Sequence, residues 1–184
     1  MKQPARHKTT MLICFLLIVL TAVADLYLLR PFPEKCYGLI RLENGWLCRW
    51  GDSPRDINGV PSWLLSGNDG WNKAELRQAS FNSQSKFIWF RTTLPDKEIK
   101  DPHIIFPTYE QCIDVYLENK LIYRYGWDNK NSFSIGSHWN ILSLSPEYKG
   151  KILSIRVYSH SPIFTGEIQD FFMGTGRDID SYKN

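Results

Sequence analysis

Aromatic, basic and acidic side chains occur together near several predicted turns, in a pattern that favours a site for a polar ligand. Aromatic rings stack on the apolar faces of sugars, and neighbouring polar side chains bind the hydroxyl groups, because a polar group left unpaired in a partly dry site is costly. Tyr109 and Trp127 stand out because they lie beside turns, where binding residues concentrate. The full candidate set is Trp89, Arg91, Tyr109, Glu110, Trp127, Asp128, His138, Trp139 and His160.

Each of these residues also has a purely structural interpretation. Large aromatic side chains dominate burial energetics, so Trp46, Trp50, Trp89 and Trp139 could equally be core or loop-filling rings. Arg91 could pair with a carboxylate on a neighbouring strand or stack on Trp89. The two interpretations predict different environments for the seven tryptophans of the chain, because a structural role requires that nearly all of them are buried.

Metal binding and catalysis find no support in the sequence. His103, His138 and His160 lack the spacing of metal ligands. Asp128-Asn129-Lys130-Asn131 looks like a calcium loop, but Lys130 stands where an oxygen ligand belongs. The chain contains no Gly-x-Ser-x-Gly elbow, phosphate-binding glycine loop or His-Glu-x-x-His motif. We therefore predict a binding protein that is not an enzyme and uses no cofactor or metal.

The elements that must position the candidate residues are predicted to be short strands separated by turns. KFIWFRTTLP (86–95) alternates strictly and ends at a proline, and Asn44-Gly45 is a strong hairpin signal between 39–42 and 46–50. Further strands are predicted in HIIFP, CIDVYL, KLIYRYG, WNILSL, KILSIRVYS and EIQDFFMG. This pattern predicts an all-β antiparallel β-sandwich. Both faces of 86–95 are apolar, so we expect the 51–85 region to cover the face that points away from the second sheet.

The N-terminus carries a candidate membrane segment. The apolar run from Thr9 to Leu29 contains one charge, Asp25, and follows three basic residues. About 20 apolar residues span a bilayer, whereas a signal-peptide core needs only about 7 to 15. The basic flank places the N-terminus in the cytoplasm and the bulk of the chain outside. Ala22-Val23-Ala24 has the pattern of a cleavage site, so cleavage stays open, and we favour an uncleaved anchor.

We accordingly predict a cell-membrane protein with a single N-terminal span and an extracytoplasmic body. Its segments are a cytoplasmic basic flank (1–8), a transmembrane anchor or uncleaved signal (9–30), a linker (31–36), the β-sandwich (37–178) and a tail (179–184). Without the first 30 residues, Lys+Arg falls from 22 by four to 18 and Asp+Glu falls from 19 by one to 18. The body is then formally neutral, which argues against nucleic acid as a partner.

The cysteines give no clear disulfide framework. Cys36 and Cys48 are the obvious pair by spacing. If Asn44-Gly45 forms a simple two-residue hairpin, however, Cys36 lies roughly 16 Å beyond the residue opposite Cys48, outside disulfide reach. We therefore disfavour this pair and expect unpaired cysteines.

Several stretches in order resemble galactose-binding-like jelly-roll domains. WFRTTLP, DVYLENKLIYRYG, HWNILSL, KILSIRVYS and FFMG are similar to the sugar-binding domain of β-galactosidase-type glycosidases. With the GWxxRWGDSP-like opening at Gly45 to Pro54, they more closely resemble the extracytoplasmic sensor domains of bacterial membrane signalling proteins. In those receptors a multi-helix membrane region and a diguanylate cyclase or histidine kinase output follow. Lys120 replaces the glycine usual in the family's hairpin.

The resemblance implies a domain that senses a ligand or partner for bacterial signal transduction, with this chain either a fragment of a larger receptor or a stand-alone relative. The alternative is a carbohydrate-binding module on a secreted or surface protein. A third interpretation is a structural interaction domain. The partners implied are the membrane, a small molecule such as a saccharide, and a second receptor copy.

Overall fold

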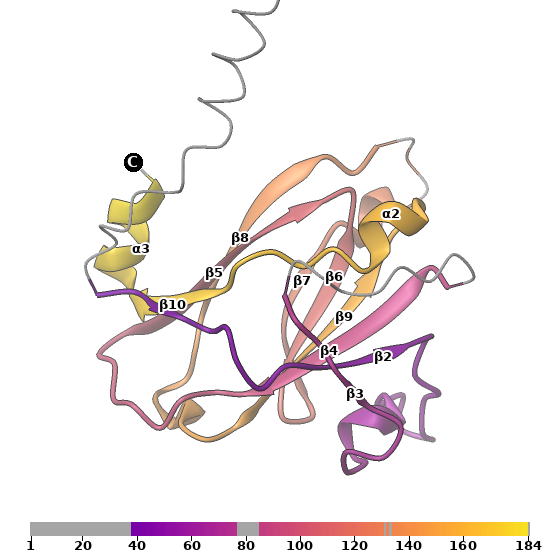
Figure 1. Cartoon of the computed structure of the whole chain (residues 1–184), viewed down its shortest axis with the longest axis horizontal. Helices are drawn as coiled ribbons and strands as arrows, with labels where there is room; N and C mark the ends of the chain where they lie inside the picture. The colour runs from indigo at the N-terminus through magenta and orange to yellow at the C-terminus, as the bar shows by residue number, and fades with distance from the viewer. Residues whose placement is uncertain (1–37, 77–84, 131, 133, 184) are drawn as a thin grey trace, which may run out of the picture. The chain divides into compact units, whose positions relative to one another are not determined.

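Antiparallel strands arranged in two stacked layers make up the described part of the chain (Figure 1). The computed structural model describes residues 38–76, 85–130, 132 and 134–183. In spatial order, the four-stranded sheet contains β1 (Ile40–Arg41), β10 (Phe172–Thr175), β5 (Pro102–Tyr109) and β8 (Ser137–Ser143). The six-stranded sheet contains β3 (Asn72–Lys73), β2 (Leu47–Trp50), β4 (Phe87–Thr93), β9 (Ile152–Tyr158), β6 (Cys112–Leu117) and β7 (Lys120–Tyr125). The predicted antiparallel β-sandwich is thus confirmed.

The core lies between the two sheets and follows from the period-two alternation of the strands. Ile88 and Phe90 of β4 and Ile155 of β9 face Ile104 and Phe106 of β5, and all five are almost completely buried. Phe106 also stacks on Phe171, with ring centroids 4.1 Å apart. Burying such side chains contributes about 1.5–3 kcal/mol each, so this layer stabilises the sandwich.

The outer face of the six-stranded sheet is covered as well, as the sequence predicts. Trp89 and Arg91 alternate with Ile88 and Phe90 on β4 and therefore point away from the core. The segment 51–76, which includes η1 (Ser62–Leu64), lies over them. Trp63 meets Trp89 edge-on at 6.1 Å, and Arg91 donates to the carbonyl oxygens of Ser66 and Gly67.

The predicted hairpin at Asn44-Gly45 is wrong. β1 pairs with β10 in one sheet, and β2 pairs with β4 in the other. Gly45, at φ +77°, instead lies where the chain crosses between the sheets. The cause is Trp46, whose ring is buried against Phe171 at 4.9 Å and whose indole N–H donates to the Leu42 carbonyl at 2.8 Å. This tertiary burial outweighs the local turn preference.

Without a hairpin at Asn44-Gly45, the spacing of Cys36 and Cys48 no longer excludes a disulfide between them. Cys48 and Cys112 are buried free thiols, and burial raises the pKa of both, that of Cys112 to about 11. Cys36 lies outside the described residues.

Helical segments occur only as short pieces in the described ranges. They are η1 (Ser62–Leu64), η2 (Trp127–Asn129), η3 (Pro146–Tyr148), α2 (Pro162–Thr165) and α3 (Gly176–Lys183). The predicted tail is thus part of a helix, which packs against the four-stranded sheet through the buried Ile179. No described helix is both long and apolar enough to cross a membrane. The predicted span at 9–30 lies outside the described residues.

Candidate functional site

Three connections meet at one end of the sandwich: the β5–β6 turn, the β7–β8 loop and the β9–α2 loop. Glu110 occupies the turn at φ +52°, and its carboxylate accepts hydrogen bonds from the Ser134 hydroxyl at 2.5 Å and the backbone N–H groups of Ile135 and Gly136 at 2.8 and 3.1 Å. These donors, the Ser134 hydroxyl first, lower the pKa of Glu110. Glu110 therefore stays ionised and fixes the β7–β8 loop to the β5–β6 turn.

A hollow of about 250 Å³ opens between these loops. Its lining combines hydroxyl groups, a carboxylate and an imidazole with two apolar side chains. The lining residues are Glu110, Ser134, Ile135, Ser159, His160, Ser161 and Phe164. The Ser159 hydroxyl donates to the Glu110 carbonyl at 2.7 Å, whereas the Ser161 hydroxyl has no partner among the described residues. The hollow thus offers Ser161 as an unoccupied donor beside an apolar wall.

His160 connects this hollow to the outer face of the six-stranded sheet. Its Nδ1 lies 3.2 Å from the Tyr158 hydroxyl, and its Nε2 bonds to the Lys130 carbonyl oxygen. The second bond identifies Nε2 as the N–H donor, and Nδ1 then accepts from the tyrosine. His160 therefore ties η2 and the β9–α2 loop together.

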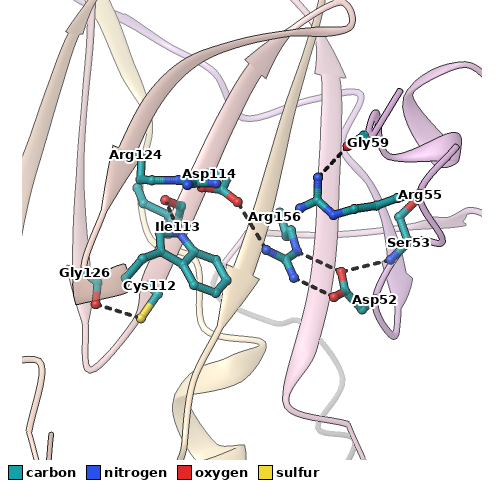
Figure 2. Close-up of polar contacts among 11 residues, drawn as sticks. Asp52, Ser53, Arg55, Gly59, Cys112, Ile113, Asp114, Arg124, Gly126 and Arg156 are labelled. Atoms are coloured by element: carbon teal, nitrogen blue, oxygen red, sulfur yellow. Dashed lines mark hydrogen bonds and ion pairs between the residues drawn. The ribbon is translucent and has the colours of Figure 1, made fainter. Parts of the chain in front are cut away.

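A row of charges crosses the outer face of the six-stranded sheet (Figure 2). Arg124 Nε donates to Asp114 Oδ1 at 2.7 Å, and Arg156 Nη1 donates to Asp114 Oδ2 at 3.2 Å. Arg156 also binds Asp52 through two bonds of 2.7 and 2.5 Å. The Asp114 side chain is completely buried and that of Arg156 is 9% exposed. The two carboxylates raise the pKa of Arg156 against the effect of its burial.

Trp127 lies beside this row, at the start of η2. Its indole N–H donates to the Ile113 carbonyl at 3.0 Å, and the Arg156 guanidinium lies 4.6 Å from its ring centroid. The ring is half-buried, and neighbouring Asp128 is exposed. The structure thus brings Glu110, Trp127, Asp128 and His160 to the same end of the sandwich.

Trp89 and Arg91 occupy a different environment, beneath the 51–76 segment. Trp89 is completely buried and stacks on Tyr116 at 5.6 Å. Arg91 is 4% exposed and lies 4.1 Å from the Trp71 ring. Burial first, and then the charge of Arg49, lower the pKa of Arg91. The Trp89 and Arg91 side chains therefore fill the layer under this segment.

The remaining candidates lie on the four-stranded sheet. Tyr109 ends β5, opposite Ser137 of β8. His138 stacks on Tyr125 with centroids 4.1 Å apart, and burial lowers its pKa. Trp139, 37% exposed, meets Tyr182 of α3 edge-on. Tyr109 and His138 thus flank the loop end, while Trp139 belongs to the contact with α3.

Burial of the tryptophans does not match a purely structural role. Trp46 and Trp89 are buried, whereas Trp139 is exposed and the other four are partly exposed: Trp50, Trp63, Trp71 and Trp127. No group of three or more His, Cys, Asp or Glu side chains in the described part of the chain could hold a metal ion.

Sequence reasoning missed the row formed by Asp52, Asp114, Arg124 and Arg156. Asp52 and Arg156 are 104 positions apart in the chain, so no local pattern links them. The one available signal was the charge of Asp114 and Arg156 within two otherwise apolar strands.

Comparison with protein-family models finds no match, and neither does comparison with curated proteins. Solved glycosidases contain similar folds. A β-glucuronidase from Faecalibacterium prausnitzii is 14% identical, with a TM-score of 0.44 over 68% of this chain and 22% of the glycosidase. A β-glucuronidase from an uncultured Clostridium is 10% identical, with a TM-score of 0.47 over 71% and 24%. A Kluyveromyces marxianus β-glucosidase in complex with glucose is 15% identical, with a TM-score of 0.39 over 76% and 16%. The chain thus spans less than a quarter of these proteins, and the likeness concerns the fold alone.

Proposed function

We propose that this chain is a membrane-tethered, extracytoplasmic β-sandwich that binds a saccharide at its loop end. The hollow between the β5–β6, β7–β8 and β9–α2 loops carries the proposal. Its volume, about 250 Å³, lies just below the about 300–1,000 Å³ of pockets for drug-sized ligands. It therefore suits a ligand of monosaccharide size.

The chemistry of the lining supports a ligand with both polar and apolar faces. Ser161 supplies a hydroxyl group that is free to donate or accept, while Ile135 and Phe164 supply apolar surface. Glu110 and His160 already bond to the surrounding loops, so they shape the hollow before any ligand arrives. Such preorganisation lowers the entropic cost of binding.

Calorimetric titration of the full chain tests this proposal. Galactose, glucose, glucuronic acid and lactose serve as probes, in a polyoxyethylene detergent that contains no sugar. Ser161→Tyr fills the hollow and is expected to weaken binding about tenfold or more. Ser145→Tyr is the control, because Ser145 is likewise a helix N-cap without a side-chain capping bond, and it is exposed where Ser161 is half-buried. Absence of binding to every probe, or equal binding by Ser161→Tyr, contradicts the proposal.

A second candidate function is signalling, with the same sandwich as the sensor of a receptor whose output domain is a diguanylate cyclase or histidine kinase. One structural observation favours it: the first described residue and the last helix are neighbours. A Cβ atom on Gly38 would lie 2.6 Å from the Asp178 carboxylate of α3, and β1 pairs with β10, which leads into α3. The first described residue and α3 therefore lie at one end of the sandwich, whereas α2 lies at the other (Figure 1).

Signalling requires two conformations of the protein, and the ligand must bind one of them more tightly than the other. We therefore expect a bound saccharide to change hydrogen exchange in α3 as well as in the loops. Exchange that changes only around the hollow favours a binding module without signalling.

A further inference from the structure

Three aromatic rings surround one ammonium group beside the hollow. Lys130 Nζ lies 4.5 Å from the ring centroid of Tyr158, 5.5 Å from that of Trp127 and 5.7 Å from that of Phe87. Attraction between a cation and an aromatic face extends to about 6 Å. All three rings therefore contribute to binding the same nitrogen.

The sheet positions these rings independently of the lysine. Phe87 and Tyr158 are direct cross-strand partners of β4 and β9, with ring centroids 4.9 Å apart. Trp127 is fixed by its hydrogen bond to the Ile113 carbonyl and lies 6.0 Å from Tyr158 at an interplanar angle of 29°. The arrangement would therefore remain if the Lys130 side chain moved away.

Lys130 has no carboxylate partner among the described residues, so the rings alone contact its charge. Two other cations lie at these rings: Arg156, 4.7 Å from the Phe87 centroid and 4.6 Å from that of Trp127, and Arg124, 5.8 Å from that of Trp127. Both arginines form ion pairs, Arg156 with Asp52 and Asp114 and Arg124 with Asp114. Phe87, Trp127 and Lys130 are each partly exposed, so an external ligand can reach the position that the ammonium occupies.

We propose that Phe87, Trp127 and Tyr158 form an aromatic cage for organic ammonium groups, which Lys130 occupies in the free protein. Aromatic cages bind quaternary ammonium ions because the faces of the rings attract the positive charge. An external quaternary ammonium group competes with Lys130 for the cage. This site is separate from the saccharide hollow and does not depend on it.

Titration calorimetry of the full chain with tetramethylammonium and choline tests the cage, in a maltoside detergent that carries no ammonium group and at constant ionic strength. Lys130→Ala vacates the cage and is expected to tighten binding about three- to tenfold, because the internal competitor is gone. Lys149→Ala is the matched control, since Lys149 is likewise the C-cap of a short 3-10 helix and is exposed. It should bind as the unmodified chain does.

Two further measurements identify the cage as the site. Trp127→Leu in the Lys130→Ala background should weaken binding at least to the level of the unmodified chain. The uncharged choline analogue 3,3-dimethylbutan-1-ol should not bind. No saturable binding to Lys130→Ala, equal affinity with and without Lys130, or equal binding of the uncharged analogue would each overturn the proposal, whatever the saccharide titration shows.

Discussion

At the scale of single residues, Asp114 is the centre of the outer-face charges. It is completely buried and is shared by Arg124 and Arg156. Buried ion pairs add little net stability over apolar residues, but removal of one partner leaves an uncompensated buried charge. Loss of Asp114 would remove one of the two carboxylates that pair with Arg156, which keeps its two bonds to Asp52.

We expect Asp114→Ala to lower the free energy of unfolding by about 1–3 kcal/mol, because buried donors of Arg156 lose one acceptor while the pair with Asp52 remains. Denaturant unfolding measures this, with Asp96→Ala as the control, because Asp96 is exposed and should change stability by less than about 0.5 kcal/mol. Adding Arg156→Met should recover part of the loss. A double variant as unstable as the sum of the single changes would show that the two residues act independently.

Glu110 is expected to make the free energy of unfolding depend on pH. Its pKa is lowered in the folded chain, chiefly by the Ser134 hydroxyl and the Ile135 N–H, from about 4.3 in unfolded chains. The stabilisation is therefore fully present above the unfolded pKa and is lost as the pH falls through the lower folded pKa.

Glu110→Gln should accordingly flatten the acid limb of a plot of unfolding free energy against pH, while lowering stability at neutral pH. Urea unfolding between pH 7 and 3 measures both effects. Parallel acid limbs for the two proteins would show that the Glu110 carboxylate is not fixing the β7–β8 loop.

At the scale of elements, the turn from β7 into η2 depends on Gly126. Its φ is +80°, and a Cβ atom there would lie 3.0 Å from the Gln111 carbonyl oxygen and 3.2 Å from Cys112 Cα. Both neighbours are backbone atoms, so no side-chain rotation can make room for the Cβ atom. The left-handed conformation and the close approach therefore both require glycine.

Gly59 offers a matched control, since its φ is +78° and nothing lies within 4 Å of a Cβ atom there. Gly59→Ala should cost about 1–2 kcal/mol of unfolding free energy from conformation alone. Gly126→Ala should cost clearly more and should also weaken ligand binding at the loop end. Equal losses measured by denaturant unfolding would rule out the crowding at Gly126.

The elements also show which parts of the fold local sequence patterns can predict. The β6–β7 hairpin around Glu118-Asn119 and the covered β4 strand are predictable, because alternation and turn chemistry are local. The crossing at Gly45 is not, because it follows from the burial of Trp46 against Phe171, far along the chain. Helix α3 contains one buried side chain, Ile179, so it shows no apolar periodicity.

At the scale of the whole molecule, the sandwich determines which predicted site residues meet. Glu110, His160 and the pair Trp127 and Asp128 come from three different connections, and the return of the strands to one end brings them together. Trp89 and Arg91 lie elsewhere, because strand alternation turns them under the 51–76 segment. Residue types identify such candidates in the sequence. Which candidates lie together depends on the order of the strands in the sheets, which local sequence patterns do not reveal.

The central claim is that the loop end binds a saccharide. Amide chemical shifts of the ¹⁵N-labelled full chain test it most directly, recorded during titration with each sugar that binds in calorimetry. We predict saturable shifts at Glu110, 134–136, 159–161, 163 and 164, with small changes elsewhere except near α3. Shifts confined to another surface, or none with any sugar, would contradict the account.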